Sequence, residues 1–144
     1  MICFFDTNVL VYAVDAGDPI RREHALERLA RAARDDTVVL RTQVLQEFYA
    51  IVTRKLSPPL SCNEAAEQVQ RLCAFQVMGS TAQSVQTAIA LAQEHQMHWW
   101  DALILEAALR ARADLLLSEN GQAGRRYGDL VVENPFAVPR TRPD

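Results

Sequence analysis

The stretch that decides the fold is Ile2-Cys3-Phe4-Phe5, an apolar run that ends abruptly at the carboxylate of Asp6. Four apolar residues are too few for a helix, so this run predicts a short buried strand. A short helix is expected to follow, from Asn8 to about Val14. Because an isolated buried carboxylate is very costly, Asp6 must be paired, hydrated or bound to a cation.

Two more acids interrupt apolar stretches in the same way. Glu47 lies within Val44-Leu45-Gln46-Glu47-Phe48-Tyr49, and Asp101 lies within Trp99-Trp100-Asp101-Ala102-Leu103-Ile104. Acids gathered in one pocket repel each other, which costs stability unless a cation neutralises them. Hard cations such as Mg²⁺ take oxygen ligands, usually one or two carboxylates with water in the remaining positions. The three acids therefore suggest a single pocket for a divalent metal.

The composition is that of an ordinary soluble globular protein. The 144 residues are 49% apolar and 23% charged, and no apolar run is long enough to span a bilayer. We expect one domain over residues 1–138 and a short C-terminal tail over 139–144. The first residues contain no basic leader, which predicts a cytoplasmic protein without a secretory signal. Cys3, Cys62 and Cys73 are odd in number and lack metal-type spacing, so they are interpreted as reduced structural residues.

The net charge of −3 is not typical of a nucleic-acid binder, although it counts acids that a metal would neutralise. Arginines nevertheless cluster at three places along the chain: Arg21, Arg22, Arg28, Arg31 and Arg34; Arg125 and Arg126; Arg140 and Arg142. The first cluster is consistent with a phosphate-attracting surface and equally with a solvated helix face. Both interpretations stay open.

Short apolar runs separated by amphipathic segments predict alternating strands and helices. Further strands are expected at 37–40, 75–78, 115–117 and 130–132. Helices are expected at 20–34, at 42–56 with Thr42 as N-cap, from a capping box at Ser61 and Glu64, at 80–95, and from about Asp101. The helix at 20–34 is expected to bury Ala25, Leu26, Leu29 and Ala33. This order indicates a three-layer α/β/α sandwich around a parallel sheet of about five short strands.

The topology predicts where the acids lie. In open α/β sheets, ligands bind outside the carboxyl ends of the strands. Asp6 directly follows the first strand, and Ser118-Glu119-Asn120 follows the fourth. Glu47 and Asp101 lie in or near the first turns of helices that such strands feed. We therefore expect all four positions to reach one end of the sheet.

Each acid also has a purely structural interpretation. Asp6 could cap the following helix, Glu47 could be an exposed helix residue, and Asp101 could be a helix-start acid favoured by the dipole. His95 and His98 lack a third ligand for a transition metal, so a surface role is expected for them. Trp99-Trp100 could stack on an RNA base or pack in the core. No glycine-rich phosphate loop occurs in the sequence.

Taken together, these motifs resemble those of the PIN-domain ribonucleases, and most closely the VapC-type toxins of bacterial toxin–antitoxin pairs. The resemblance spans nearly the whole chain in the expected order and rests on Asp6-Thr7-Asn8-Val9-Leu10, Glu47, Trp100-Asp101-Ala102-Leu103-Ile104, Leu116-Leu117-Ser118-Glu119-Asn120 and Val132-Glu133-Asn134-Pro135-Phe136. It implies a parallel α/β/α sandwich, a Mg²⁺- or Mn²⁺-dependent site and endonucleolytic cleavage of RNA. For the toxins it further implies a homodimer and inhibition by a small antitoxin protein that inserts a segment near the active site.

By position, the resemblance assigns catalytic and metal-binding roles to Asp6, Glu47 and Asp101, with Glu47 able to act through water. Ser118 matches a small hydroxyl residue near the fourth acid of the family, and Asn8 matches a polar residue that orients the first acid.

One position departs from the family pattern. The family usually has Asp where this chain has Asn120, whose amide oxygen can ligate a metal but brings no negative charge. The neighbouring Glu119 could compensate only if the loop turned its side chain inward. We therefore expect weaker binding of a second metal ion rather than loss of the site.

Three hypotheses follow. The first is an endoribonuclease in which metal-activated water attacks a phosphodiester and leaves a 5′-phosphate. The second, motivated by Asn120 and the acidic net charge, is a degenerate domain that binds RNA or a protein without cutting. A phosphatase of the haloacid-dehalogenase type also begins with a strand ending in Asp, but that chemistry needs a second acid where this chain has Asn8.

Overall fold

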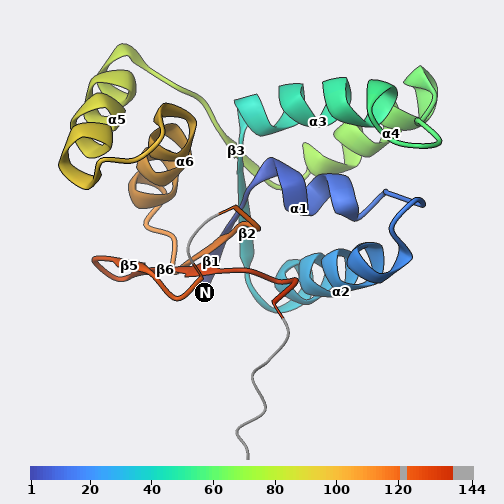
Figure 1. Cartoon of the computed structure of the whole chain (residues 1–144), viewed down its shortest axis with the longest axis horizontal. Coiled ribbons are helices and arrows are strands. Elements are labelled where there is room, and N and C mark those ends of the chain that lie inside the picture. Colours follow the sequence, from blue (N-terminus) through green and yellow to red (C-terminus); the bar gives the residue numbers. More distant parts are fainter. Residues whose placement is uncertain (121–122, 138–144) are drawn as a thin grey trace, which may run out of the picture.

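A computed structural model gives the fold of the chain and describes residues 1–120 and 123–137 (Figure 1). The elements follow one another in this order: β1 (Ile2–Phe5), α1 (Thr7–Tyr12), α2 (Pro19–Asp35), β2 (Thr37–Arg41), α3 (Thr42–Arg54), α4 (Cys62–Leu72), β3 (Gln76–Met78), α5 (Ala82–His95), α6 (Trp99–Arg110), β4 (Leu115–Leu117), β5 (Arg126–Tyr127) and β6 (Leu130–Glu133). The expected tail, 139–144, lies outside the described residues.

The strands form one sheet in the order β3-β2-β1-β4-β6-β5. The five strands expected from the sequence are parallel to one another, which confirms the parallel sheet. The sixth, β5, pairs antiparallel with β6 at one edge and was not expected. Two residues are too few to show a periodicity. The signal that could have revealed β5 is the two-residue link Gly128-Asp129, a hairpin pattern in which Gly128 adopts φ +63°.

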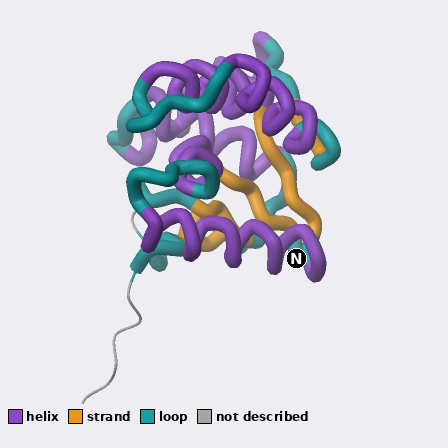
Figure 2. The backbone as a smooth tube through the Cα atoms, turned by 90° about the vertical axis from the view of Figure 1, so that its right-hand side faces the viewer, coloured by secondary structure: helices purple, strands orange, loops and turns teal. Residues whose placement is uncertain are grey.

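Helices cover both faces of the sheet, as the three-layer prediction requires. In Figure 1, α1 to α4 lie on one side of the strands and α5 and α6 on the other, and Figure 2 shows the strands between helical segments. Successive strand residues point to opposite faces. Phe5 therefore belongs to the core shared with α1 and α3, whereas Phe4 belongs to the core shared with α6.

The ends of several helices differ from the sequence prediction by one or two residues. Arg41, rather than Thr42, precedes the first turn of α3, and the hydroxyl of Thr42 instead donates to the carbonyl of Met78 at 3.1 Å. The capping box of Ser61 and Glu64 at the start of α4 is confirmed. His98 is the N-cap of α6, which places Asp101 in the first helical turn.

Three further observations complete the fold. All three cysteines are free; Cys3 is buried, and Cys62 and Cys73 are exposed. Among the described residues no helix combines the length and the hydropathy needed to cross a membrane. The backbone N–H of Asp6 donates to the carbonyl of Leu117 at 2.9 Å, which ties the end of β1 to the end of β4. These two strand ends frame the candidate site.

Candidate active site

Asp6 lies at the carboxyl end of β1 and caps α1. Its backbone is extended, at φ −79° and ψ 159°, and its Oδ1 accepts the N–H of Thr7 at 2.7 Å. Its Oδ2 accepts the hydroxyl of Ser118 at 2.8 Å. Burial raises the pKa of the Asp6 carboxyl, the two hydrogen bonds lower it, and the nearby charges of Glu47 and Asp101 raise it. Asp6 is therefore both the N-cap of α1 and a carboxylate with two other acids nearby.

Glu47 reaches the site from α3. Its Oε2 accepts the hydroxyl of Thr7 at 3.0 Å, and its Oε1 accepts the side-chain amide of Gln43 at 2.6 Å. Because Thr7 adjoins Asp6 and is itself buried, this bond fixes the α3 acid beside the β1 acid. The sequence prediction missed both donors. The spacing of Gln43 and Glu47, four residues apart on one helix face, is the signal that could have revealed Gln43 as a donor.

Asp101 reaches the site from the first turn of α6, where its side chain is exposed. Asp6 and Asp101 both line a cavity of about 260 Å³ between α6 and the strand ends, here called the α6 cavity. Asp6 and Glu47 both line a groove of about 360 Å³ beside α1 and α3. Asn120 borders both spaces. The Asp6 carboxyl thus stands between the other two acids.

The three acids do not form a closed cage. Within residues 1–120 and 123–137, no three His, Cys, Asp or Glu side chains are close enough together to hold one metal ion directly. A hard cation that keeps several waters needs only one or two direct carboxylates. Asp6 and Asp101, which both line the α6 cavity, are the two carboxylates available to such an ion. Carboxylate oxygens held by neutral donors retain free lone pairs for it.

The loop after β4 holds Asp6 from the other side. Ser118, which is 3% exposed, donates to Asp6 and accepts the backbone N–H of Asn120 at 3.3 Å. Asn8 accepts the N–H of Glu119 at 3.4 Å, so its hydrogen bond orders the loop rather than the first acid. The carboxylate of Glu119 pairs with Arg21 of α2 at 3.1 Å. Glu119 is thereby turned toward α2 and does not replace the charge that Asn120 lacks.

The far wall of the α6 cavity is aromatic and basic. His95, His98, Arg125 and Tyr127 line it together with Asp101. The rings of His95 and Tyr127 meet edge to face at 5.1 Å, and Arg125 lies over the Tyr127 ring at 4.9 Å. The two histidines therefore border the site rather than an unrelated surface. Trp100 is 63% exposed, and no core packing holds its ring.

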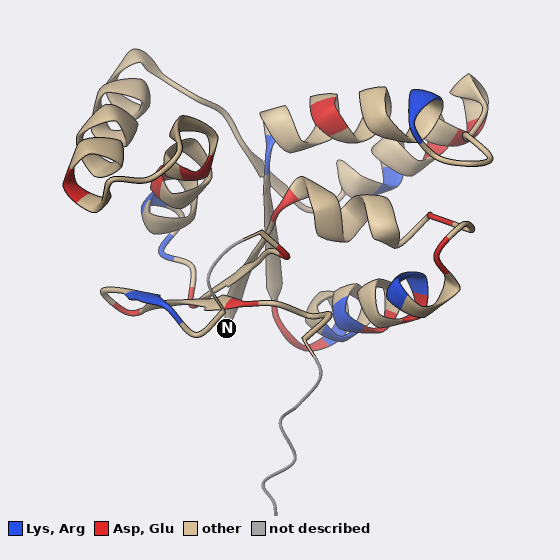
Figure 3. Cartoon of the chain, in the orientation of Figure 1, with Lys and Arg blue, Asp and Glu red and all other residues tan. Residues whose placement is uncertain are grey.

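Three arginines of the early cluster form ion pairs with acids of the chain itself. Figure 3 shows basic and acidic residues interspersed along α2. Arg21 pairs with Asp18 and Glu119, and Arg34 pairs with Asp35. Arg28 is buried and pairs with Glu133 at 2.7 Å. This pairing favours the structural interpretation of α2 over a phosphate-attracting surface.

With this geometry established, the chain can be compared with known proteins. The family model of the PIN domain matches residues 3–128. The chain belongs to the PIN-domain family. This assignment sets aside the haloacid-dehalogenase alternative, and no curated protein sequence matches the chain.

Solved structures share the PIN fold at low sequence identity. VapBC2 of Rickettsia felis, bound to a DNA fragment from its promoter, matches with a TM-score of 0.67 and 21% identity over 93% of this chain and 98% of the other. A toxin–antitoxin complex of Klebsiella pneumoniae matches with a TM-score of 0.62 and 20% identity over 94% and 99%. VapC20 of Mycobacterium tuberculosis, described as a toxin that cleaves the sarcin–ricin loop, matches with a TM-score of 0.61 and 20% identity over 79% and 86%. This PIN domain therefore has the fold of VapC toxins.

Proposed function

We propose that the chain is a Mg²⁺- or Mn²⁺-dependent endoribonuclease, the toxin component of a toxin–antitoxin pair. The observation that carries the proposal is the Asp6 carboxyl at the end of β1, held by Ser118 and approached by the charges of Glu47 and Asp101. Such a grouping of acids is expensive without a cation. The PIN fold and the fold similarity to the toxin that cleaves the sarcin–ricin loop support RNA as the substrate.

The three acids have different roles in this proposal, according to their positions in the site. A bound divalent cation would supply an activated water and neutralise charge on the phosphate. Asp6 and Asp101, which line one cavity, would hold the cation there. Glu47, fixed by Thr7 and Gln43, would orient the attacking water. The rings of His95, His98 and Tyr127 line the α6 cavity beside these acids.

The partners follow from the same similarity. Solved neighbours are toxin–antitoxin complexes, which supports a small antitoxin protein as partner. A homodimer as the working form is part of the same proposal. Cytoplasmic RNA would be the target of such a toxin, so a cytoplasmic location is part of the proposal.

Cleavage of RNA by the purified protein tests the proposal. Asp6→Asn and Asp101→Asn are expected to abolish cleavage in Mg²⁺ while circular dichroism shows an intact fold. Asp129→Asn is the matched control, because Asp129 is exposed in the turn after β5 and lines neither cavity. Full activity of either site variant in Mg²⁺ would defeat the assignment.

A second candidate function is favoured by Asn120, which removes one charge from the family pattern. It is a PIN domain that binds RNA or a protein partner without cutting. Incubation of the pure protein with RNA in Mn²⁺, with and without chelator, separates the two. Cleavage that the chelator stops removes the binding-only alternative, and RNA binding without any cleavage supports it.

A further inference from the structure

Arg41 is a buried arginine at the mouth of the sheet whose role the acidic site does not yet explain. It is the last residue of β2, is 4% exposed, and its Cα partner in β3 is Met78. Val39, two residues earlier, belongs to the core shared with α6. Because strand residues two apart point to the same face, Arg41 points toward α6.

The guanidinium is incompletely satisfied by hydrogen bonds. Its Nε is buried and has no hydrogen-bond partner among the described residues. Burial lowers the pKa of Arg41, whereas the charges of Glu47, Glu106 and Asp6 raise it. An arginine stays protonated in proteins, so the side chain is a fixed positive charge. A buried cation of this kind is tolerated only where surrounding carboxylates compensate its desolvation.

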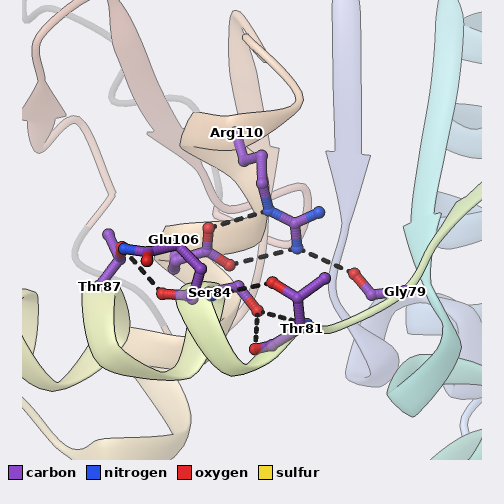
Figure 4. A network of polar contacts seen from close by, with 7 residues as sticks. Gly79, Thr81, Ser84, Thr87, Glu106 and Arg110 are labelled. Atoms are coloured by element: carbon purple, nitrogen blue, oxygen red, sulfur yellow. Dashed lines mark hydrogen bonds and ion pairs between the residues drawn. The ribbon is translucent and has the colours of Figure 1, made fainter.

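One of those carboxylates already has a partner. Figure 4 shows Glu106 held by Arg110, with Nε–Oε2 at 3.0 Å and Nη2–Oε1 at 3.3 Å. The same guanidinium donates to the carbonyl of Gly79 at 2.9 Å, which fixes it in place. The Glu106–Arg110 pair is therefore close to neutral. The parallel register that pairs Phe4 with Val39 places Arg41 beside Asp6 at the ends of β2 and β1, so the charges that Arg41 is left to balance are those of Asp6 and Glu47.

We propose that Arg41 is a resident counter-ion of the acidic site, a positioning residue whose fixed charge stabilises the metal-free protein and opposes the divalent cation. The inference rests on the proposed function. Asp6, Glu47 and Asp101 carry −3 and Arg41 carries +1, which leaves −2. Asn120 adds no charge. Arg125, on the wall of the α6 cavity, reduces the remaining negative charge further, so the site has no charge left for a second divalent ion.

Mn²⁺ binding without RNA tests the proposal. Arg41→Met keeps an unbranched apolar side chain and removes the charge, so Mn²⁺ should bind roughly tenfold more tightly or better by calorimetry. Arg31→Met makes the same change in net charge on the exposed face of α2 and should leave the affinity unchanged. Arg41→Lys retains the charge and should bind Mn²⁺ as the wild type does. Equal or weaker binding by Arg41→Met, or two Mn²⁺ ions per wild-type chain, would overturn the proposal.

A second measurement separates this proposal from the nuclease assignment. In chelator, Arg41→Met should melt below the wild type, and adding Glu47→Gln should recover part of the loss, because the charge that Arg41 balances is then gone. A double variant that melts no higher than Arg41→Met would contradict the counter-ion role even if RNA cleavage is confirmed. A wild type that binds no Mn²⁺ would instead remove the metal from the proposed function, and the recovery in chelator would still support the counter-ion.

Discussion

Ser118→Ala removes the hydroxyl that donates to Asp6 at 2.8 Å and accepts the N–H of Asn120 at 3.3 Å. At 3% exposure, Ser118 leaves little room for water to replace it. A hydrogen bond to a charged acceptor contributes about 1.5–3 kcal/mol. We therefore expect the free energy of unfolding in chelator at neutral pH to fall by that amount. The melting temperature should fall by roughly 5–10 °C for a protein of this size.

Ser84→Ala is the matched control. Ser84 is 5% exposed, donates to the carbonyl of Thr81 at 2.8 Å and accepts the N–H of Thr81 at 2.8 Å. Ser84→Ala therefore removes one donated and one accepted hydrogen bond, as Ser118→Ala does. The group that accepts the hydroxyl of Ser84 is a neutral carbonyl rather than a carboxylate. Its replacement should cost about 1 kcal/mol. Since no acid is involved, that cost should not depend on pH.

The dependence on pH identifies the charge. Burial raises the pKa of Asp6 above its ordinary value of 3.8, so the folded protein binds more protons than the unfolded chain just above that pH. The contribution of the Asp6 carboxyl to the free energy of unfolding is therefore lost as the pH rises through its pKa in the folded protein. The Ser118 bond lowers that pKa, so it limits the loss, and Ser118→Ala should make the loss larger. Below both pKa values the carboxyl is protonated in either protein and this difference disappears.

Urea denaturation of both variants in chelator, from about pH 8 to about pH 4, measures the effect. The cost of Ser118→Ala should shrink toward acid pH, whereas the cost of Ser84→Ala should stay constant. A Ser118→Ala cost that is equal at both ends of the range would refute the reasoning. So would a cost at neutral pH no greater than that of the control.

Three further predictions concern the surroundings of the site. Arg110→Met should lower the free energy of unfolding by about 2–3 kcal/mol, because it leaves the buried Glu106 without its ion-pair partner. Replacing both residues by methionine should recover most of that loss, as urea denaturation would show. Tyr127→Ala should raise KM for RNA with little change in kcat, since the ring lines the cavity beside the acids, whereas Tyr49→Ala on the surface of α3 should change neither. Chelation of the metal should stop RNA cleavage. The products formed in Mg²⁺ should carry a 5′-phosphate that end-labelling detects, whereas a 2′,3′-cyclic phosphate product would exclude attack by metal-activated water.

Much of the fold could be predicted because each parallel strand is a short apolar run. The buried stripe of α2 could not be predicted as well. Its spacing favoured Leu26 and Ala33, but Leu26 is 44% exposed and the buried positions include Arg28 and Ala32. Arg28 is inside because its guanidinium meets Glu133, which lies 105 residues away in the sequence. A pattern of apolar residues contains no information about such a partner.

The site shows the same limit. The acids were found because each interrupts an apolar segment that topology carries to one end of the sheet. The donor Thr7 could not be predicted, because it is an ordinary helix residue until α1 and α3 pack together, whereas the spacing of Gln43 and Glu47 on α3 was a signal that the prediction missed. Arg41 falls between the strand expected at 37–40 and the helix expected at 42–56, and its burial in the structure is what reveals its charge as part of the site.

The way each acid is paired separates the structural acids from the candidate catalytic ones. Three acids outside the candidate site are each bonded to an arginine from another turn or element: Glu106 to Arg110, Glu119 to Arg21, and Glu133 to Arg28. Within the part of the chain that the structure describes, the hydrogen bonds that hold Asp6 and Glu47 come only from neutral donors, an amide N–H, two hydroxyls and a side-chain amide. Neutral donors fix a carboxylate in position without cancelling its charge. Arg41, which makes no direct ion pair with either acid, offsets part of it. A fold that pairs Glu106, Glu119 and Glu133 with arginine and leaves Asp6 and Glu47 with a net negative charge is suited to binding a cation from solution.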